Sequence, residues 1–300
     1  MSHTTPSDNA LRKAAWALIR NKGVRLKVKN LIINRPAFYL SESNYCRYII
    51  LLSKFLSISG ETYSLKCIEQ NSSSVVDQIV WKIEGIDIPI IIQSQYRISR
   101  FLKGFSHAGK RQWDRYGLSE LIGVQAPDVL IDIGANIGEV SFYASRAGIS
   151  RVIAIDPDPI AGECLRFNLR DTDVEIDLRA IGEKNGRVSF YSKAQSADSS
   201  FFKPEGKYFL VDVESLTLDR FFCEKGVLGN VLLKMDAEGF EPEILKSGLV
   251  AIQNIKWVAI DASAERGRET TVEEVVRILN NSGFQFISVS HSNIVTASRK

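Results

Sequence analysis

The stretch Val129-Leu-Ile-Asp-Ile-Gly-Ala-Asn-Ile-Gly-Glu139 constrains the fold of this chain more than any other. Its first five residues are an apolar run interrupted only by Asp132, which is typical of a central parallel strand covered by helices on both faces. Gly134 and Gly138 then allow a sharp turn and the close approach of a ligand. A helix predicted after the turn directs free N–H groups at it, which favours an anionic group there. The alternative is an ordinary strand–turn–helix that carries two glycines.

From this point a regular alternation of strands and helices runs towards the end of the chain. Strands are predicted at Val129–Ile133, Arg151–Ile155, Val174–Ala180, Val231–Met235 and Lys256–Asp261. Helices are predicted at Gly138–Arg146, Pro159–Leu169, Pro242–Ser247 and Val272–Asn281. Repeated β–α units of this length imply parallel strands with right-handed crossovers. The predicted fold class is therefore α/β, with a doubly wound, Rossmann-like sheet that binds ligands at the carboxyl ends of its strands.

The part of the chain before this alternation has a different pattern. Val80–Glu84 and Ile86–Ile92 flank a glycine and predict a β-hairpin, in which Pro89 is acceptable only on an edge strand. A polar, helical region is predicted from Tyr96 to Ile122. We therefore expect residues 1–125 to form an N-terminal α+β extension, a candidate for acceptor recognition, and residues 126–300 to form the ligand-binding domain.

The charge of the chain is small but uneven. A net charge of +3 does not favour a nucleic-acid partner. Between Leu11 and Ser41, however, there are eight basic residues and no acidic one, interspersed with apolar residues. This basic amphipathic segment is suited to peripheral contact with an anionic membrane surface, or to packing on the protein itself.

The cysteines and the first residues of the chain indicate the cellular location of the protein. The four cysteines lack metal-binding spacing and offer no disulfide framework, which favours a reducing cytoplasm. Met1–Asn9 is polar and no apolar stretch follows, so no secretory signal is predicted. The predicted location is the cytoplasm, with peripheral contact at the inner membrane face as an extension of that prediction.

An acid follows the glycine turn at the spacing expected for a nucleoside site. Asp156 ends the second predicted strand, eighteen positions beyond Gly138, and its two oxygens are suited to both hydroxyls of a ribose. The alternative is that Asp156 caps the helix after Pro157. The glycine spacing differs from the Gly-x-Gly-x-x-Gly of dinucleotide sites. Asp132 and Asn136 also supply polar groups for an amino-acid moiety, so the pattern favours S-adenosylmethionine over a nicotinamide cofactor.

Four segments together resemble the FkbM-type methyltransferases, a class I family dependent on S-adenosylmethionine. In chain order they are Asp132–Gly138, Ala154–Pro159, Ser215–Asp219 and Leu233–Glu241. The resemblance covers about residues 125–265. It implies the class I methyltransferase fold and O-methylation of a hydroxyl, often on a sugar or a polyketide-type molecule.

The resemblance also implies where the cofactor binds. It places the methionine part at the glycine turn and the ribose at Asp156. The predicted cofactor-binding residues are Asp132, Gly134, Ala135, Asn136, Gly138 and Asp156. The chain departs from the family at Asp156 and Asp261, since Glu is common at both positions, and the shorter side chains change the reach of these carboxylates.

The segment Lys234-Met-Asp-Ala-Glu-Gly-Phe-Glu241 places a lysine and three carboxylates at the end of a buried strand. Such charges are costly unless they are paired or face a site. Asp236 and Glu238 share one side if strand geometry continues. Their predicted role is to take the proton of the acceptor hydroxyl, directly or through a metal held by Asp236 and Asp261. Mg²⁺ would suit such oxygen ligands, but a metal is not expected.

Two further residues complete the set of candidate catalytic groups. Lys234 is a candidate because it shares this segment; the alternative is a structural ion pair with Asp236 or Glu241. His107 is a candidate general base from the N-terminal region. The predicted acceptor is a sugar, glycan, glycolipid or small-molecule natural product. The alternatives are an RNA methyltransferase and a non-catalytic nucleoside-binding protein of the same fold.

Overall fold

A computed structural model describes residues 67–72, 79–84, 87–193, 199–204, 206, 208–266 and 269–299. Residues 66–300 group into one compact unit. The basic segment between residues 11 and 41 lies outside the described residues, and the division at residue 125 stays a prediction. Within the described ranges, none of the helices has the length and apolar character needed to cross a membrane.

The centre of the fold is a seven-stranded sheet in the order β12-β13-β11-β10-β4-β5-β6. The strands are β4 (Val129–Ile133), β5 (Arg151–Ile155), β6 (Glu175–Asp177), β10 (Val231–Met235), β11 (Ile255–Asp261), β12 (Phe286–Val289) and β13 (Ile294–Ser298). The run from β6 to β11 is parallel, and β13 is antiparallel to both of its neighbours. Strand order reverses between β4 and β10, which is where a doubly wound sheet binds its ligand. The predicted α/β, doubly wound fold class is confirmed.

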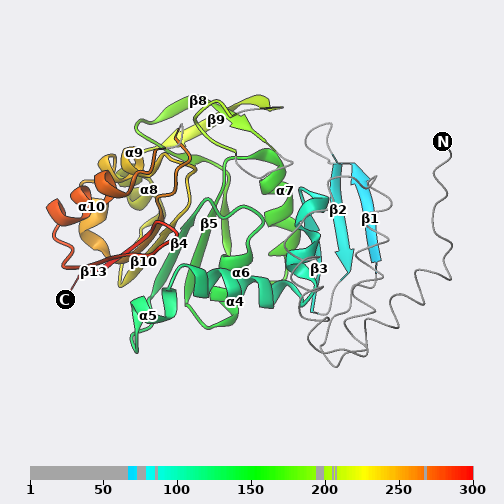
Figure 1. The fold of residues 1–300 in the computed structure, drawn as a ribbon, viewed down its shortest axis with the longest axis horizontal. Helices are drawn as coiled ribbons and strands as arrows, with labels where there is room; N and C mark the ends of the chain where they lie inside the picture. The colour runs from blue at the N-terminus through cyan, green and yellow to red at the C-terminus, as the bar shows by residue number, and fades with distance from the viewer. Residues whose placement is uncertain are drawn as a thin grey trace, which may run out of the picture. The chain divides into compact units, whose positions relative to one another are not determined.

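Helices cover both faces of this sheet, as Figure 1 shows. One face carries α4 (Phe105–Arg115), α5 (Leu118–Ile122) and α6 (Glu139–Arg146), and the other carries α8 (Leu218–Lys225), α9 (Glu241–Lys246) and α10 (Val272–Asn281). Successive side chains of β4 alternate between the two cores, with Leu130 in one and Ile131 in the other. Both faces of the strand are therefore dry, which explains its continuous apolar sequence. The chain also has α7 (Pro159–Asn168) and the short 3-10 turn η2 (Ala251–Asn254).

The predicted β-hairpin is part of a small antiparallel sheet in the order β1-β2-β3. Its strands are β1 (Cys67–Ser72), β2 (Ile79–Glu84) and β3 (Pro89–Ile92). Because β3 is an edge strand, the prediction for Pro89 is confirmed. Asn168 at the end of α7 accepts a hydrogen bond from the Ile91 N–H (2.8 Å) and donates to the carbonyls of Ile91 and Ile137 (both 2.9 Å). This buried amide fixes β3 beside the glycine turn, which contains Ile137.

The predicted helical region from Tyr96 to Ile122 forms, but in three pieces. They are the 3-10 helix η1 (Gln95–Phe101), α4 and α5, separated by Gly104 (φ 95°) and Gly117 (φ 62°). Helix α4 packs closely on α6, because a Cβ on Gly109 would overlap the carbonyl oxygen of Glu139. This packing brings the C-terminal end of α4 over the carboxyl ends of the strands.

The third predicted strand, Val174–Ala180, is wrong as a single strand. It divides into β6 and β7 (Ala180–Ile181), and β7 joins a separate sheet with β9 (Phe209–Leu216) and β8 (Gly186–Ser192). The physical cause is a turn at Asp177, whose carboxylate accepts hydrogen bonds from the backbone N–H (3.1 Å) and Nε (2.9 Å) of Arg179.

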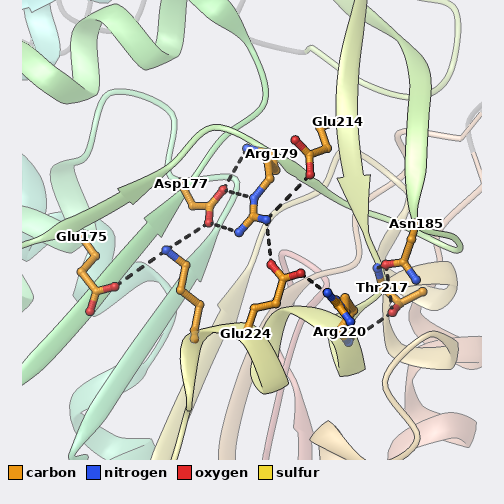
Figure 2. A network of polar contacts seen from close by, with 9 residues as sticks. Glu175, Asp177, Arg179, Asn185, Glu214, Thr217, Arg220 and Glu224 are labelled. Atoms are coloured by element: carbon orange, nitrogen blue, oxygen red, sulfur yellow. Dashed lines mark hydrogen bonds and ion pairs between the residues drawn. The ribbon is translucent and has the colours of Figure 1, made fainter.

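The turn at Asp177 is part of a wider network of charged groups, drawn in Figure 2. Arg179 Nη1 also donates to Glu224 of α8 (2.8 Å) and lies 3.8 Å from Glu214 of β9. Lys225 lies 3.2 Å from Asp177. The network joins the large sheet, the sheet of β7, β9 and β8, and α8. It therefore fixes the position of β7 at the edge of the site described next.

Candidate active site

The glycine turn brings three left-handed residues together at the end of β4. They are Gly134 (φ 70°), Asn136 (φ 54°) and Gly138 (φ 92°). A Cβ on Gly134 would overlap the carbonyl oxygen of Asp236, so the ends of β4 and β10 approach this closely only because Gly134 lacks a side chain. The backbone N–H groups of Gly134 and Ala135 both donate to the Ile155 carbonyl (2.9 and 3.0 Å). The turn is thus fixed from both neighbouring strands.

A cavity opens above this turn at the carboxyl ends of the strands. Seven of the predicted site residues line it: Gly134, Ala135, Asn136, Asp156, Lys234, Asp236 and Glu238. The predicted residues Asp132, Gly138, His107 and Asp261 do not line it. The geometry of each group explains the difference.

Asp132 and Lys234 form a buried ion pair beneath the turn. They are register partners on β4 and β10, and Lys234 Nζ lies 2.9 Å from Asp132 Oδ1. Lys234 also donates to the Gly134 carbonyl (2.9 Å), and the Ser141 hydroxyl donates to Asp132 Oδ2 (2.7 Å). Burial alone would lower the pKa of Lys234, but the charges of Asp132 and Asp236 and the hydrogen bond to Asp132 together outweigh burial and raise it. Lys234 is therefore held as a cation that supports the turn, and its structural partner is Asp132 rather than Asp236 or Glu241.

Asp156 stands at the cavity with both oxygens oriented by the backbone. It accepts hydrogen bonds from the N–H groups of Asn136 (2.8 Å) and Asp158 (3.0 Å). Burial and then the charge of Asp158 raise the pKa of Asp156 to about 7. Asp158, not Asp156, caps α7 by accepting from the N–H groups of Ile160 and Ala161. The capping alternative for Asp156 is wrong; the proline at the first position of the helix, Pro159, was the signal that identifies the cap.

Asp236 receives a hydrogen bond from a tyrosine that the sequence prediction gave no role. The hydroxyl of Tyr116, directly after α4, donates to Asp236 Oδ2 (2.7 Å). Tyr116 is buried and lines the cavity. Burial and then the Asp236 charge raise the pKa of Tyr116 well above its ordinary value, so the phenol stays protonated. No described residue donates to the other oxygen of Asp236.

The two remaining acids of the segment after β10, Glu238 and Glu241, have different roles. Glu238 lines the cavity with a left-handed backbone (φ 51°). Glu241 is fully buried, and its Oε1 accepts from the N–H groups of Ala237 (3.0 Å) and Gly239 (3.1 Å). Burial raises the pKa of Glu241 to about 7. Glu241 thus fixes the loop that carries Asp236 and Glu238.

Asp261 lies close to Asp236 in a group of three carboxylates. Oxygens of Asp236, Asp261 and Glu265 lie within 4.8 Å of one another, close enough to share one divalent cation. Arg115 Nη2 already lies 2.5 Å from Asp261, and Tyr116 donates to Asp236. Burial, followed by the charge of Asp236, raises the pKa of Glu265 to about 8. A proton and an arginine therefore balance much of the negative charge that a cation would otherwise neutralise.

The structure does not bring His107 to the cavity. It lies exposed on α4, and burial together with Lys103 and Arg111 lowers its pKa. Gly138 does not line the cavity either: a Cβ there would meet Leu165 of α7 and Leu169, directly after α7, at 3.1 Å. Its role is to let the turn pack on α7.

Comparison with known proteins identifies the family. The methyltransferase FkbM domain model matches residues 132–286, more than half of the chain. The chain belongs to the FkbM methyltransferase family. It is therefore a methyltransferase, and the predicted resemblance is confirmed.

Three FkbM-type relatives are similar to this chain at low identity. It is 23% identical to the 2-O-methyltransferase NoeI of Sinorhizobium fredii, over 58% of this chain and 79% of that protein. It is 26% identical to the hexuronic acid methyltransferase AglP of Haloferax volcanii, over 63% and 80% respectively. It is 25% identical to the 31-O-demethyl-FK506 methyltransferase FkbM of Streptomyces tacrolimicus, over 58% and 79%.

Several cavity residues lie outside the region matched to this family. Gln93, Arg97, Arg100, Gln112 and Tyr116 precede residue 132 and line the cavity. Sequence reasoning missed them because the family motifs begin at β4. The two arginines and the tyrosine among these five residues were the available signal.

Proposed function

We propose that this FkbM-type enzyme transfers a methyl group from S-adenosylmethionine to a hydroxyl of a sugar, a glycan, a glycolipid or a small-molecule natural product. The observation that carries the proposal is the environment of Asp236. One of its oxygens is bound by Tyr116, and the other has no hydrogen-bond donor among the described residues, at the lining of the cavity. An oriented carboxylate with a free oxygen is suited to accept the proton of an acceptor hydroxyl.

The residues around the cavity suit this cofactor. In this proposal Asp156 binds the ribose, and the apolar lining residues Ile155, Ala180, Ile181 and Phe190 contact the adenine. The Oδ1 atom of Asn136 is buried and lacks a hydrogen-bond partner among the described residues, as expected of an acceptor for a donor group of the ligand. The bound cofactor supplies an electrophilic methyl group on a sulfonium.

The role of the chain in the transfer is positioning and proton removal. The new bond joins the acceptor oxygen to the methyl carbon, the carbon–sulfur bond breaks, and the hydroxyl proton moves to Asp236. In this proposal Glu238, which also lines the cavity, binds a neighbouring hydroxyl of the acceptor. Holding the reacting atoms in line supplies much of the rate enhancement.

The acceptor class rests on the family. The names of the relatives refer to a 2-O-methyl transfer, a hexuronic acid and a demethylated FK506. Acceptors of this kind carry several hydroxyls, which suits the adjacent carboxylates of Asp236 and Glu238. We extend the proposal to peripheral membrane contact through the basic segment between residues 11 and 41, because a glycolipid acceptor would lie at such a surface.

The experiment that tests the proposal uses cofactor labelled in the methyl group and a panel of extracted glycans, lipids and metabolites. The purified chain should transfer label to a hydroxyl-bearing acceptor. Asp236→Asn should lower the rate by about 10²–10⁴-fold while S-adenosylmethionine affinity stays the same. Asp212→Asn is the matched control, since Asp212 lies exposed on β9. Full turnover by Asp236→Asn would refute the role of Asp236, and no saturable cofactor binding would refute the whole proposal.

The proposed transfer does not depend on Mg²⁺. Arg115 and Tyr116 already donate to two of the three carboxylates that would bind a cation. Treatment with EDTA should therefore leave the initial rate unchanged within about twofold of the untreated rate, a negligible barrier change. A loss of activity that added Mg²⁺ restores would contradict this part of the proposal.

A further inference from the structure

A group of basic residues from the segment before β4 forms one wall of the cavity. Arg97 and Arg100, both on η1, line it together with Glu139, the first residue of α6. Glu139 is buried, with 7% of its surface exposed. The charges of Arg97 and Arg100 both act on Glu139, so the three charged groups lie near one another at the lining of the cavity.

Among the described residues, Arg100 has no partner that matches its burial. No carboxylate of a described residue lies within ion-pair distance of its guanidinium, and no described residue accepts a hydrogen bond from it. Burial and the nearby charge of Arg97 lower the pKa of Arg100, and Glu139 only partly offsets them. A half-buried guanidinium at a cavity wall without such a partner is suited to an anionic ligand group.

Glu139, in contrast to Arg100, is suited to a cationic ligand group. Burial raises its pKa, and the charges of Arg97 and Arg100 partly offset this shift. Two uncharged side chains that line the same cavity also offer free acceptors. The buried oxygens Gln93 Oε1 and Asn136 Oδ1 have no hydrogen-bond donor among the described residues. Gln93 is 6% exposed and lies between β3 and η1. Together these oxygens offer acceptors for a ligand that carries several N–H groups.

The position of these groups relates them to one end of the cofactor. The groups assigned to the nucleoside come from β5, β7 and β8, on one side of the turn. Glu139 is instead the first residue of α6, where free backbone N–H groups favour a carboxylate, and Arg100 lies close enough for its charge to act on Glu139. Asp156, Gly134 and this pair all line one cavity, so a single ligand can contact Asp156 with its ribose and this pair with its other end.

We infer that the segment Gln93–Arg100 completes the cofactor site by binding the α-amino-acid end of S-adenosylmethionine. Arg100, with Arg97 beside it, binds the α-carboxylate. Glu139 and the free oxygens of Gln93 and Asn136 accept hydrogen bonds from the α-ammonium group. This inference rests on the proposed function, and it assigns a part of the predicted acceptor-recognition extension to the cofactor instead.

Binding of two cofactor fragments tests the inference without an acceptor. Isothermal titration calorimetry is carried out on the full chain with S-adenosylhomocysteine, which has the amino-acid end, and with 5′-methylthioadenosine, which lacks it. Arg100→Gln should weaken S-adenosylhomocysteine binding by about 10–100-fold, because a charge-assisted contact is lost. Binding of 5′-methylthioadenosine should stay within about twofold of the unmodified chain. Arg111→Gln, an exposed arginine of α4 that does not line the cavity, is the matched control.

A second variant keeps the test independent of the folding of the first. Glu139→Gln retains the shape of the side chain and should weaken S-adenosylhomocysteine binding selectively, by about tenfold. The inference is overturned if either variant weakens both ligands equally, or if Arg100→Gln leaves both unchanged, the result expected if Arg100 instead binds an anionic acceptor. The proposed function fails separately, if the unmodified chain binds neither ligand.

Discussion

Gly134 determines how closely β4 and β10 approach, and its replacement has a defined cost. It has a left-handed backbone, and a Cβ there would overlap the Asp236 carbonyl oxygen. Gly148 is the matched control, since it is also left-handed (φ 89°), but a Cβ there would meet no atom within 4 Å. Gly148→Ala should cost about 1–2 kcal/mol of unfolding free energy from the backbone alone. Gly134→Ala should cost roughly 2 kcal/mol more, from the overlap.

Urea unfolding measures both glycine variants. Equal costs at the two positions would show that the ends of β4 and β10 separate without penalty. In that case the turn would not hold Asp236 in place.

Glu265 makes the stability of the protein depend on pH. Its pKa in the folded state is raised to about 8, whereas an exposed glutamate has a pKa of about 4.3. Between these values the unfolded chain loses the proton and the folded chain keeps it, so this group stabilises the fold at low pH and loses that contribution as pH rises. Glu265→Gln should match the unmodified chain near pH 4.5. By pH 8.5 it should be more stable by about 1–2 kcal/mol, discounted for partial solvent exposure.

Thermal unfolding from pH 4.5 to 8.5 checks this difference. Glu269→Gln serves as the control because Glu269 is exposed. A constant difference between Glu265→Gln and the unmodified chain across the range would contradict the raised pKa.

At the scale of elements, the C-terminal end of α4 supports the site through two consecutive residues. Arg115 bonds to Asp261 on β11, and Tyr116 bonds to Asp236 after β10. Tyr116→Phe removes only the hydroxyl and leaves Asp236 without its orienting donor. The turnover number should fall by about 10–100-fold, the value of a hydrogen bond to a charged group, while the KM for the cofactor stays the same.

Tyr143→Phe is the matched control for Tyr116→Phe. Tyr143 lies on α6 and packs against Trp113 of α4, with ring centroids 5.6 Å apart. Its variant should retain turnover within about twofold, since packing without a hydrogen bond to the site is preserved. A similar loss in both variants would mean that α4 acts on the site through packing alone.

The elements differ in how well the sequence predicts them, for a physical reason. β4, β5 and β10 were predicted to the residue, because a strand buried on both faces is a short apolar run with clear limits. The small sheet of β7, β8 and β9 and the antiparallel pair β12 and β13 were not predicted. Most β8 and β9 residues are exposed or half-buried, so their sequences lack that apolar signal.

The residues of the site also differ in how well the sequence predicts them. The glycine turn, Asp156 and Asp236 were predicted, since each lies in a motif next to a buried strand. Tyr116 and Asp236 are 120 positions apart, and only the packing of α4 on α6 brings them together. No local pattern encodes that contact, and the ion pair of Lys234 with Asp132 depends on strand register in the same way.

At the scale of the whole molecule, the predicted boundary at residue 125 concerns whether the preceding segment folds separately. The contacts of α4 argue for joint folding with the sheet. Gly109 lies against the backbone of Glu139, and the rings of Phe105 and Phe142 have centroids 5.1 Å apart. Trp113 belongs to the same core as Leu130 and Leu232 of the central strands. Elements that share one core open together.

Hydrogen exchange followed by mass spectrometry tests this joint folding. In the regime where exchange reports equilibrium opening, amides of α4 and α6 should show the same opening free energy, within about 1 kcal/mol, and the same dependence on urea. Addition of S-adenosylhomocysteine should slow exchange in both helices and in η1, because Arg100 of η1 and Glu139 of α6 face one cavity. Amides of β12, which lies at the far edge of the large sheet, are the internal reference. If α4 instead exchanges through a low-energy opening that leaves α6 protected, residue 125 marks a true folding boundary, and the residues before it close over a site that is already formed.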